Sequence, residues 1–329
     1  MAANNCPAVC VYGAEVIQRY LSAFRKEYPG LLRSRDIEFV HRIRVASRRL
    51  NTALVIFHND YHDKRMRVWQ KDVRQVTRIL GQARDLDIQA ACVKDFLKGL
   101  SEPAKRPGVR RLLLRIIQRR QRAQKKMLTV LDELDRHQTL TAIDIKSRAR
   151  AKTKRGQFDV NYVELTAFAS KAIIPRLKKF LSYDPYVEHV EAVEELHAMR
   201  LAAKSLRYTL ECFASIYKDG LAGYLSALRK IQEQLGIIHD CDIWESSKDD
   251  FIVDERRRTI KYFGTDRQLD RLIPGLDCFF EYRRTQRNES YAAFVQYWSE
   301  LRRIKIWDML RKQISPAKDD TGQAPARER

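Results

Sequence analysis

Apolar residues recur every three or four positions along most of the chain, which is the spacing of one face of an α-helix. In residues 41–57, at about 100° per residue, one face collects the apolar positions, namely Ile43, Ala46, Leu50, Leu54 and Phe57. Glycine and proline, with 12 and 9 residues, are scarce in a chain of 329. The pattern therefore predicts an all-α protein.

The same spacing delimits the expected helices. They are predicted over residues 8–28, 36–59, 64–80, 86–100, 109–135, 162–181, 187–217, 221–235 and 276–313. Pro29-Gly30, the segment 101–108 and Pro274-Gly275 combine proline with glycine, which is typical of a break between helices. Over residues 240–263 we expect a short helix or a loop.

One helical stretch occurs twice. Residues 41–57 (HRIRVASRRLNTALVIF) and 197–213 (HAMRLAAKSLRYTLECF) share the pattern H-x-x-R-x-A-x-[RK]-x-L-x-x-x-L-x-x-F, at an offset of 156 residues, 197 − 41. Gap-free agreement of this length indicates an internal repeat. Away from the apolar face, each copy carries positive charge, on His41, Arg44 and Arg48 and on His197, Arg200, Lys204 and Arg207. A merely solvated face is the alternative, and the duplication with a leading histidine disfavours it.

A second motif is also duplicated. Residues 80–87 read LGQARDLD and residues 235–242 read LGIIHDCD, at an offset of 155, 235 − 80. The glycines, Gly81 and Gly236, suit the position just past a helix end. The aspartates, Asp85 and Asp87 with Asp240 and Asp242, suit the start of the next helix, where a carboxylate caps free N–H groups. The alternatives are that they orient a neighbouring His or Arg, or that they bind a metal.

Charge narrows the class of partner. The formal net charge is +21, and the sequence pI is about 9.8. A chain this basic is expected to bind a polyanion, which could be nucleic acid, an anionic membrane or a phosphate polymer. Because the basic residues lie on segments with helical apolar spacing, a disordered basic tail does not explain them. We recognise no signal peptide and no long apolar run, and we expect a cytoplasmic protein without a membrane span.

The repeat divides the chain into two expected halves, residues 8–145 and 161–313. Between them lies a strongly basic stretch, 146–160, which we expect to be a linker, and residues 314–329 are expected to be a disordered tail. Cys6 and Cys10 stand one helical turn apart, but no further metal ligands lie near them, so no metal site is predicted there.

Together, the two histidine-headed stretches, the two LG-x-x-[RH]-D-x-D motifs and the basic helices that follow them resemble the CHAD family, the conserved histidine α-helical domain. The resemblance covers residues 8–313. It implies two pseudo-symmetric four-helix bundles around a central basic groove or pore, binding of inorganic polyphosphate, and no catalysis or cofactor. The E-x-E-x-K signature of the triphosphatase domain that often accompanies CHAD domains is absent, so the resemblance implies a stand-alone module, with polyphosphate granules as a conceivable location.

The resemblance also implies which residues contact polyphosphate. They are His41, Arg44, Arg48, Arg49, Arg74, Arg115, Arg119, Arg122, His197, Arg200, Lys204, Arg207, Arg229, Lys230, Arg283 and Arg287. The two copies differ in detail, because Ser205 stands at the position of Arg49 and His239 at that of Arg84. The implied surface is therefore not symmetric residue by residue.

Two other functions stay open at this point. A helical RNA- or DNA-binding protein would also be basic, but aromatic residues do not alternate with the basic ones as single-strand binding usually requires. A metal-dependent phosphohydrolase or metal-storage protein could use His41, His197, His239 and the four motif aspartates. Against it, no helix carries an H-x-x-x-H pair or closely spaced carboxylates.

Overall fold

The computed structural model describes residues 7–33, 37–58, 65–154 and 162–315, and within these ranges all regular structure is helical. The first half contains α1 (Pro7–Arg33), α2 (Ile37–Ile56), α4 (Met66–Gly99), α5 (Arg106–Arg136) and α6 (Thr139–Lys154). The second contains α7 (Tyr162–Leu181), α8 (Val193–Phe213), α9 (Ala222–Phe263), α10 (Ile273–Arg303) and α11 (Ile306–Ile314). The predicted all-α fold is confirmed. None of the described helices is long and apolar enough to cross a membrane.

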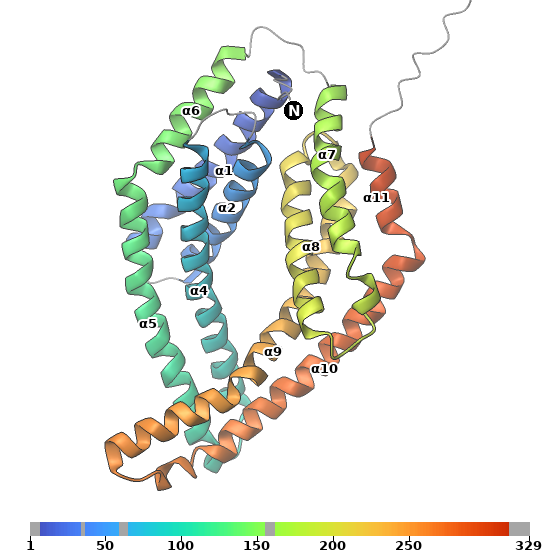
Figure 1. Cartoon of the computed structure of the whole chain (residues 1–329). Coiled ribbons are helices and arrows are strands. Elements are labelled where there is room, and N and C mark those ends of the chain that lie inside the picture. Colours follow the sequence, from blue (N-terminus) through green and yellow to red (C-terminus); the bar gives the residue numbers. More distant parts are fainter. Residues whose placement is uncertain (1–6, 34–36, 59–64, 155–161, 316–329) are drawn as a thin grey trace, which may run out of the picture.

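The two sequence halves lie side by side and share a core (Figure 1). The duplicated phenylalanines Phe57 and Phe213 meet edge to face, with 6.0 Å between ring centroids, and Phe168 of α7 stacks on Phe57 at 5.7 Å. The Tyr12 hydroxyl on α1 donates a hydrogen bond of 2.7 Å to the Cys212 carbonyl on α8. Aromatic side chains bury much apolar area, so this contact fixes α2 against α8.

A second, smaller core joins the far ends of two helical hairpins (Figure 1), α4–α5 and α9–α10. Phe279 and Trp244 are buried there, with 5.1 Å between ring centroids. The start of α5 crosses the start of α10 at two glycines. A Cβ on Gly108 would overlap the Leu272 carbonyl oxygen, and one on Gly275 would overlap that of Lys105. Only glycine allows the two backbones to approach this closely.

The helix ends differ from the sequence prediction at the LG-x-x-[RH]-D-x-D motifs, where the predicted breaks and caps are wrong. Gly81 lies inside α4, which runs for 34 residues, and Gly236 lies inside α9, which runs for 42. Neither glycine has the positive φ of a helix end; among the described glycines only Gly264 does. Buried residues on both sides of each glycine keep one helix face in the core, and such packing outweighs the low helix propensity of glycine. Asp85 and Asp240 therefore do not cap helices.

Other boundaries also shift. Residues 240–263 form the second part of α9, and α1 continues past Pro29 to Arg33. The predicted helix 187–217 is shorter in the structure, where only α8 forms. The predicted helix 276–313 is divided into α10 and α11 at Lys305, whose φ of 52° is left-handed and interrupts the helix. The expected linker at 146–160 begins inside α6, which packs on α1. Residues 155–161 and 316–329, the rest of that linker and nearly all of the predicted tail, lie outside the described residues.

Candidate anion-binding site

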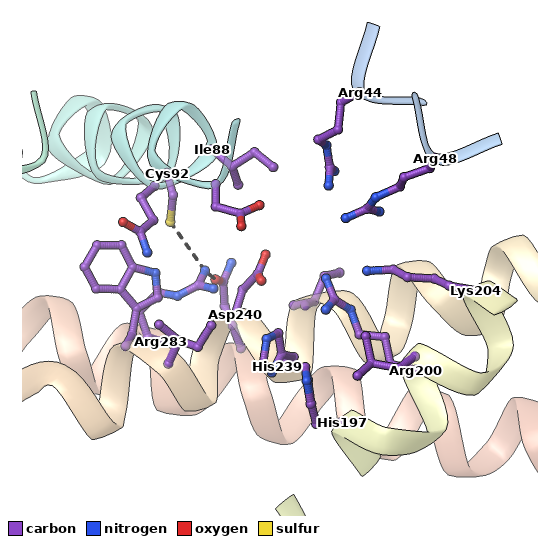
Figure 2. A pocket seen from close by; sticks show the side chains of 17 residues that line it. Arg44, Arg48, Ile88, Cys92, His197, Arg200, Lys204, His239, Asp240 and Arg283 are labelled. Atoms are coloured by element: carbon purple, nitrogen blue, oxygen red, sulfur yellow. Dashed lines mark hydrogen bonds between the residues drawn. The ribbon is translucent and has the colours of Figure 1, made fainter. Parts of the chain in front are cut away.

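A cavity of about 470 Å³ lies where α2, α4, α8, α9 and α10 face one another. Two cations of α2, Arg44 and Arg48, enter it from one side, and Arg200 and Lys204 of α8 enter it from the other (Figure 2). The two residues of each pair are four positions apart in the sequence, so their side chains project from the same face of the helix. The opposite, buried face holds each helix in place, through Ile43 and Leu50 on α2 and Met199 and Leu206 on α8.

These four cations share the cavity with two carboxylates, Asp85 and Asp240, but form no ion pair with them. Among the described residues, none forms an ion pair with Arg44, Arg48, Arg200 or Lys204. The Nε atoms of Arg44 and Arg200 and the Nδ1 atom of His197 are buried without a hydrogen-bond partner there. Buried donors are normally satisfied. These three nitrogens therefore lack the partner that buried polar groups normally have.

The cations also repel one another. Burial, followed by the charges of Arg200, Arg48 and Arg44, lowers the pKa of Lys204 to about 7. Burial and the neighbouring Arg48 lower the pKa of Arg44 to about 10. Both effects disfavour the charged form. An anion in the cavity would counteract both by stabilising the charged forms, so the site favours negatively charged ligands electrostatically.

Two histidines meet at the wall of the cavity. The rings of His197 on α8 and His239 on α9 stack with 3.9 Å between centroids. Burial, then Arg200 and His197, lower the pKa of His239 to about 4, and burial with Arg200 also lowers the pKa of His197. Both rings are therefore neutral at pH 7. His41 does not line the cavity; burial and Arg84 lower its pKa.

Two of the motif aspartates line the cavity beside the cations. Asp85 comes from α4 and Asp240 from α9. Burial raises the pKa of Asp240 against the opposing effect of Arg200, and Asp85 raises it further. The other two hold arginines: Asp87 accepts from Arg120 Nε at 2.8 Å, and Asp242 from Arg287 Nε at 2.6 Å. The orienting role considered from the sequence thus fits Asp87 and Asp242.

A model of the CHAD domain family matches residues 15–248 of the sequence. The chain belongs to the CHAD domain family. The match includes both histidine-headed stretches and both duplicated glycine–aspartate motifs, and hence every cavity residue except those on α10.

Solved structures give the same fold. This CHAD chain is similar to the crystal structure of the CHAD domain from the plant Ricinus communis, with a TM-score of 0.64, 18% identity, and coverage of 88% of this chain and 91% of that one. It is also similar to PptA from Streptomyces chartreusis, with a TM-score of 0.56, 15% identity, and coverage of 88% and 98%. No match was found among curated proteins.

Of the predicted contact residues, the cavity brings together Arg44, Arg48, His197, Arg200, Lys204 and Arg283. Others are occupied elsewhere in this CHAD domain. Arg49 pairs with Glu211 at 2.7 Å, and Arg207 approaches the same carboxylate at 3.8 Å. Arg115 pairs at 2.5 Å with the fully buried Glu255 of α9. Arg49 and Arg115 thus join distant helices, whereas Arg207 meets its acid within α8.

The remaining predicted residues do not line the cavity either. Arg287 is held by Asp242, as described above, and the Lys230 ammonium lies 3.8 Å from the centre of the Tyr297 ring. The others are exposed side chains that are not part of the cavity lining, namely Arg74, Arg119, Arg122 and Arg229.

Sequence reasoning did not assign some cavity residues to an anion site. His239 was considered as a metal ligand and as the counterpart of Arg84 in the second LG-x-x-[RH]-D-x-D motif, but it was not counted among the contact residues. Cys92, Gln89 and Gln286 carry no signal in the sequence. Arg283 is buried and donates to Cys92 Sγ at 3.4 Å. Within the described ranges, no cluster of three His, Cys, Asp or Glu side chains is placed to hold a metal ion.

Proposed function

We propose that this CHAD domain binds inorganic polyphosphate in the cavity and does not catalyse a reaction on it. One observation carries the proposal: four cationic side chains from two helices, two from each, converge on one cavity, and none of them forms an ion pair among the described residues. They are Arg44 and Arg48 with Arg200 and Lys204. Two carboxylates, Asp85 and Asp240, line the same cavity, so the cations outnumber the acids there. Folding such a cluster costs free energy through mutual repulsion. An anion that enters the cavity removes that cost.

The chemistry of the side chains fits a phosphate polymer. Arginine presents a planar fork of N–H donors that matches phosphate oxygens, and lysine adds a compact charge. The two cations on each helix are four residues, about 6 Å, apart along its axis, within side-chain reach of successive phosphates of a flexible chain. Polyphosphate has no bases, so it needs no aromatic platform of the kind used for single-stranded nucleic acid.

A calorimetric titration with long-chain polyphosphate tests the proposal. We expect binding whose affinity falls steeply with salt, because cations of the chain displace counterions from the polymer. A single-stranded RNA at the same phosphate concentration is expected to displace little polyphosphate. Displacement at equal concentration would instead favour a nucleic-acid-binding protein, and steady release of phosphate from the bound polymer would contradict the non-catalytic part.

Polyphosphate affinity is expected to rise by about tenfold between pH 8 and pH 6. The Lys204 pKa of about 7 leaves this group largely neutral at pH 8 in the free protein. A bound polyanion favours the charged amine and raises its pKa, so binding takes up a proton. Below pH 6 the lowered pKa values of His197 and His239 extend the rise.

Titrations in two buffers of different ionisation enthalpy measure this proton uptake directly. The matched control is Lys204→Arg, which keeps the charge but does not titrate near pH 7. Its affinity is expected to be flat between pH 8 and pH 7. Equal pH dependence in the wild type and in this variant would show that another group takes up the proton.

A further inference from the structure

The anion-binding cavity has aliphatic side chains that inorganic polyphosphate does not need. Ile88 of α4, Leu201 of α8, and Ile237 and Ile243 of α9 all line it. Each is more than a third exposed, with 38%, 50%, 44% and 39% of its surface accessible. Ile88 follows Asp87 and Ile243 follows Asp242, so two of the four occupy matched positions of the duplicated motif.

Single exposed aliphatic residues are common on protein surfaces and need no explanation. Here four of them share a cavity with four cations, and a cavity of about 470 Å³ has the size of a small-molecule site. Such sites typically combine an apolar lining with a few polar groups that fix orientation. Phosphate oxygens gain nothing from contact with isoleucine or leucine, whereas a hydrocarbon does.

The occupant that matches both parts of the lining is an anion with an apolar group attached. A second copy of this chain is disfavoured, because each copy carries a net charge of +21. A phosphate ester of an apolar alcohol offers both features in one small molecule. Its diphosphate head would take the place of two units of polyphosphate, and its hydrocarbon would cover the aliphatic side chains.

We propose that the cavity also binds alkyl diphosphates, with the head between Arg44, Arg48, Arg200 and Lys204 and the hydrocarbon on Ile88, Leu201, Ile237 and Ile243. The position of the head rests on the proposed function. The contribution of the aliphatic side chains is independent of it. The ligand class is thus widened from a purely inorganic polymer to phosphorylated amphiphiles.

The test compares hexyl diphosphate with methyl diphosphate by calorimetric titration of the full chain. The two ligands have the same head and charge, and a hexyl chain is too short to form micelles at working concentrations. Each fully buried methylene strengthens binding roughly fourfold. Because the side chains cover only part of the chain, we expect hexyl diphosphate to bind about tenfold more tightly than methyl diphosphate.

Variants locate the hydrocarbon. In Leu201→Ser/Ile237→Ser the ratio of the two affinities is expected to fall below about threefold, while the affinity for methyl diphosphate stays unchanged. The matched control is Val253→Ser/Ile260→Ser, which removes two exposed aliphatic side chains of α9 that do not line the cavity and should leave the ratio at about tenfold.

Two outcomes would overturn this inference and leave the proposed function intact. Equal affinity for the two esters, with long polyphosphate still bound, would show that the aliphatic side chains contribute nothing. An undiminished ratio in Leu201→Ser/Ile237→Ser would place the hydrocarbon elsewhere. If neither methyl diphosphate nor long polyphosphate binds, the position of the anion itself is wrong, and the proposed function fails together with the inference.

Discussion

Replacing Arg44 and Arg200 together by alanine is expected to weaken the binding of long polyphosphate by at least about 100-fold. Both guanidinium groups lie in the cavity without an ion pair, and both Nε atoms lack a hydrogen-bond partner among the described residues. A hydrogen bond to a charged group contributes about 1.5–3 kcal/mol, so losing two costs about 3–6 kcal/mol of binding free energy. Calorimetric titration at constant salt measures the loss.

The same substitution should not destabilise the free protein. Burial and the neighbouring cations lower the pKa of Arg44, and burial lowers that of Arg200, so both charges are unfavourable in the empty cavity. We therefore expect the free energy of unfolding without ligand to be unchanged or to increase. A large fall would mean that these arginines serve the fold.

The matched control is Arg74→Ala/Arg229→Ala. It removes the same two charges from exposed positions that do not line the cavity. We expect less than about a threefold loss of affinity, because exposed charges are screened by salt. If both double variants lose affinity equally, polyphosphate binds to the diffuse positive charge of the whole surface, and the cavity is not the site.

Gly108→Ala is expected to lower the free energy of unfolding by about 2–3 kcal/mol, since inserting atoms into a tightly packed contact costs typically that much. The new methyl group would overlap a backbone atom, the carbonyl oxygen of Leu272, and backbone cannot rotate away as a side chain can. The start of α5 would have to separate from the start of α10 and strain the small core around Phe279. Denaturant titration followed by circular dichroism measures the change.

Gly81→Ala provides the contrast at another helical glycine. Apart from its chain neighbours and the backbone of its own helix, no heavy atom of the described residues lies within 4 Å of the position where its Cβ would stand, and its φ is not positive. Alanine has the higher helix propensity, so we expect Gly81→Ala to be neutral or to stabilise by up to about 1 kcal/mol. A loss as large as that of Gly108→Ala would indicate that the chain needs glycine at 81 to leave the helix, as the sequence alone predicted.

The fold was predictable because its signal is local. The apolar faces of α2 and α8 follow from spacing within about twenty residues, and the family resemblance rested on the order of duplicated motifs. Gly81 and Gly236 show the limit of such reasoning. A glycine followed by aspartates is typical of a helix end, but here buried neighbours on both sides continue the helix. Whether the helix ends or continues at such a glycine is decided by tertiary packing, which cannot be read from the local sequence.

The candidate site was predictable in part for a related reason. Arg44 and Arg200 were found because they stand at matched positions of a duplicated stripe. Arg115 carries the same residue type on the same kind of helix face, yet Glu255, far along the chain, faces it from α9. A sequence does not distinguish an arginine that meets a ligand from one that meets a distant buried acid. Arg49 is a second example, because its partner Glu211 lies on α8 and is equally remote in the sequence.

Phe57 and Phe213 occupy matched positions of the duplicated stretch, and their rings touch. Contact between equivalent residues is the property of a self-complementary interface, the kind that two identical subunits form about a dyad. In such a dimer every substitution is made twice. In this single chain each copy varies alone, so the position of Arg48 is taken by Lys204 in the second copy, and that of Arg84 by His239. The two sides of the cavity are therefore chemically distinct, since two arginines of α2 face an arginine and a lysine of α8. Phosphates held on the two sides would meet different donors.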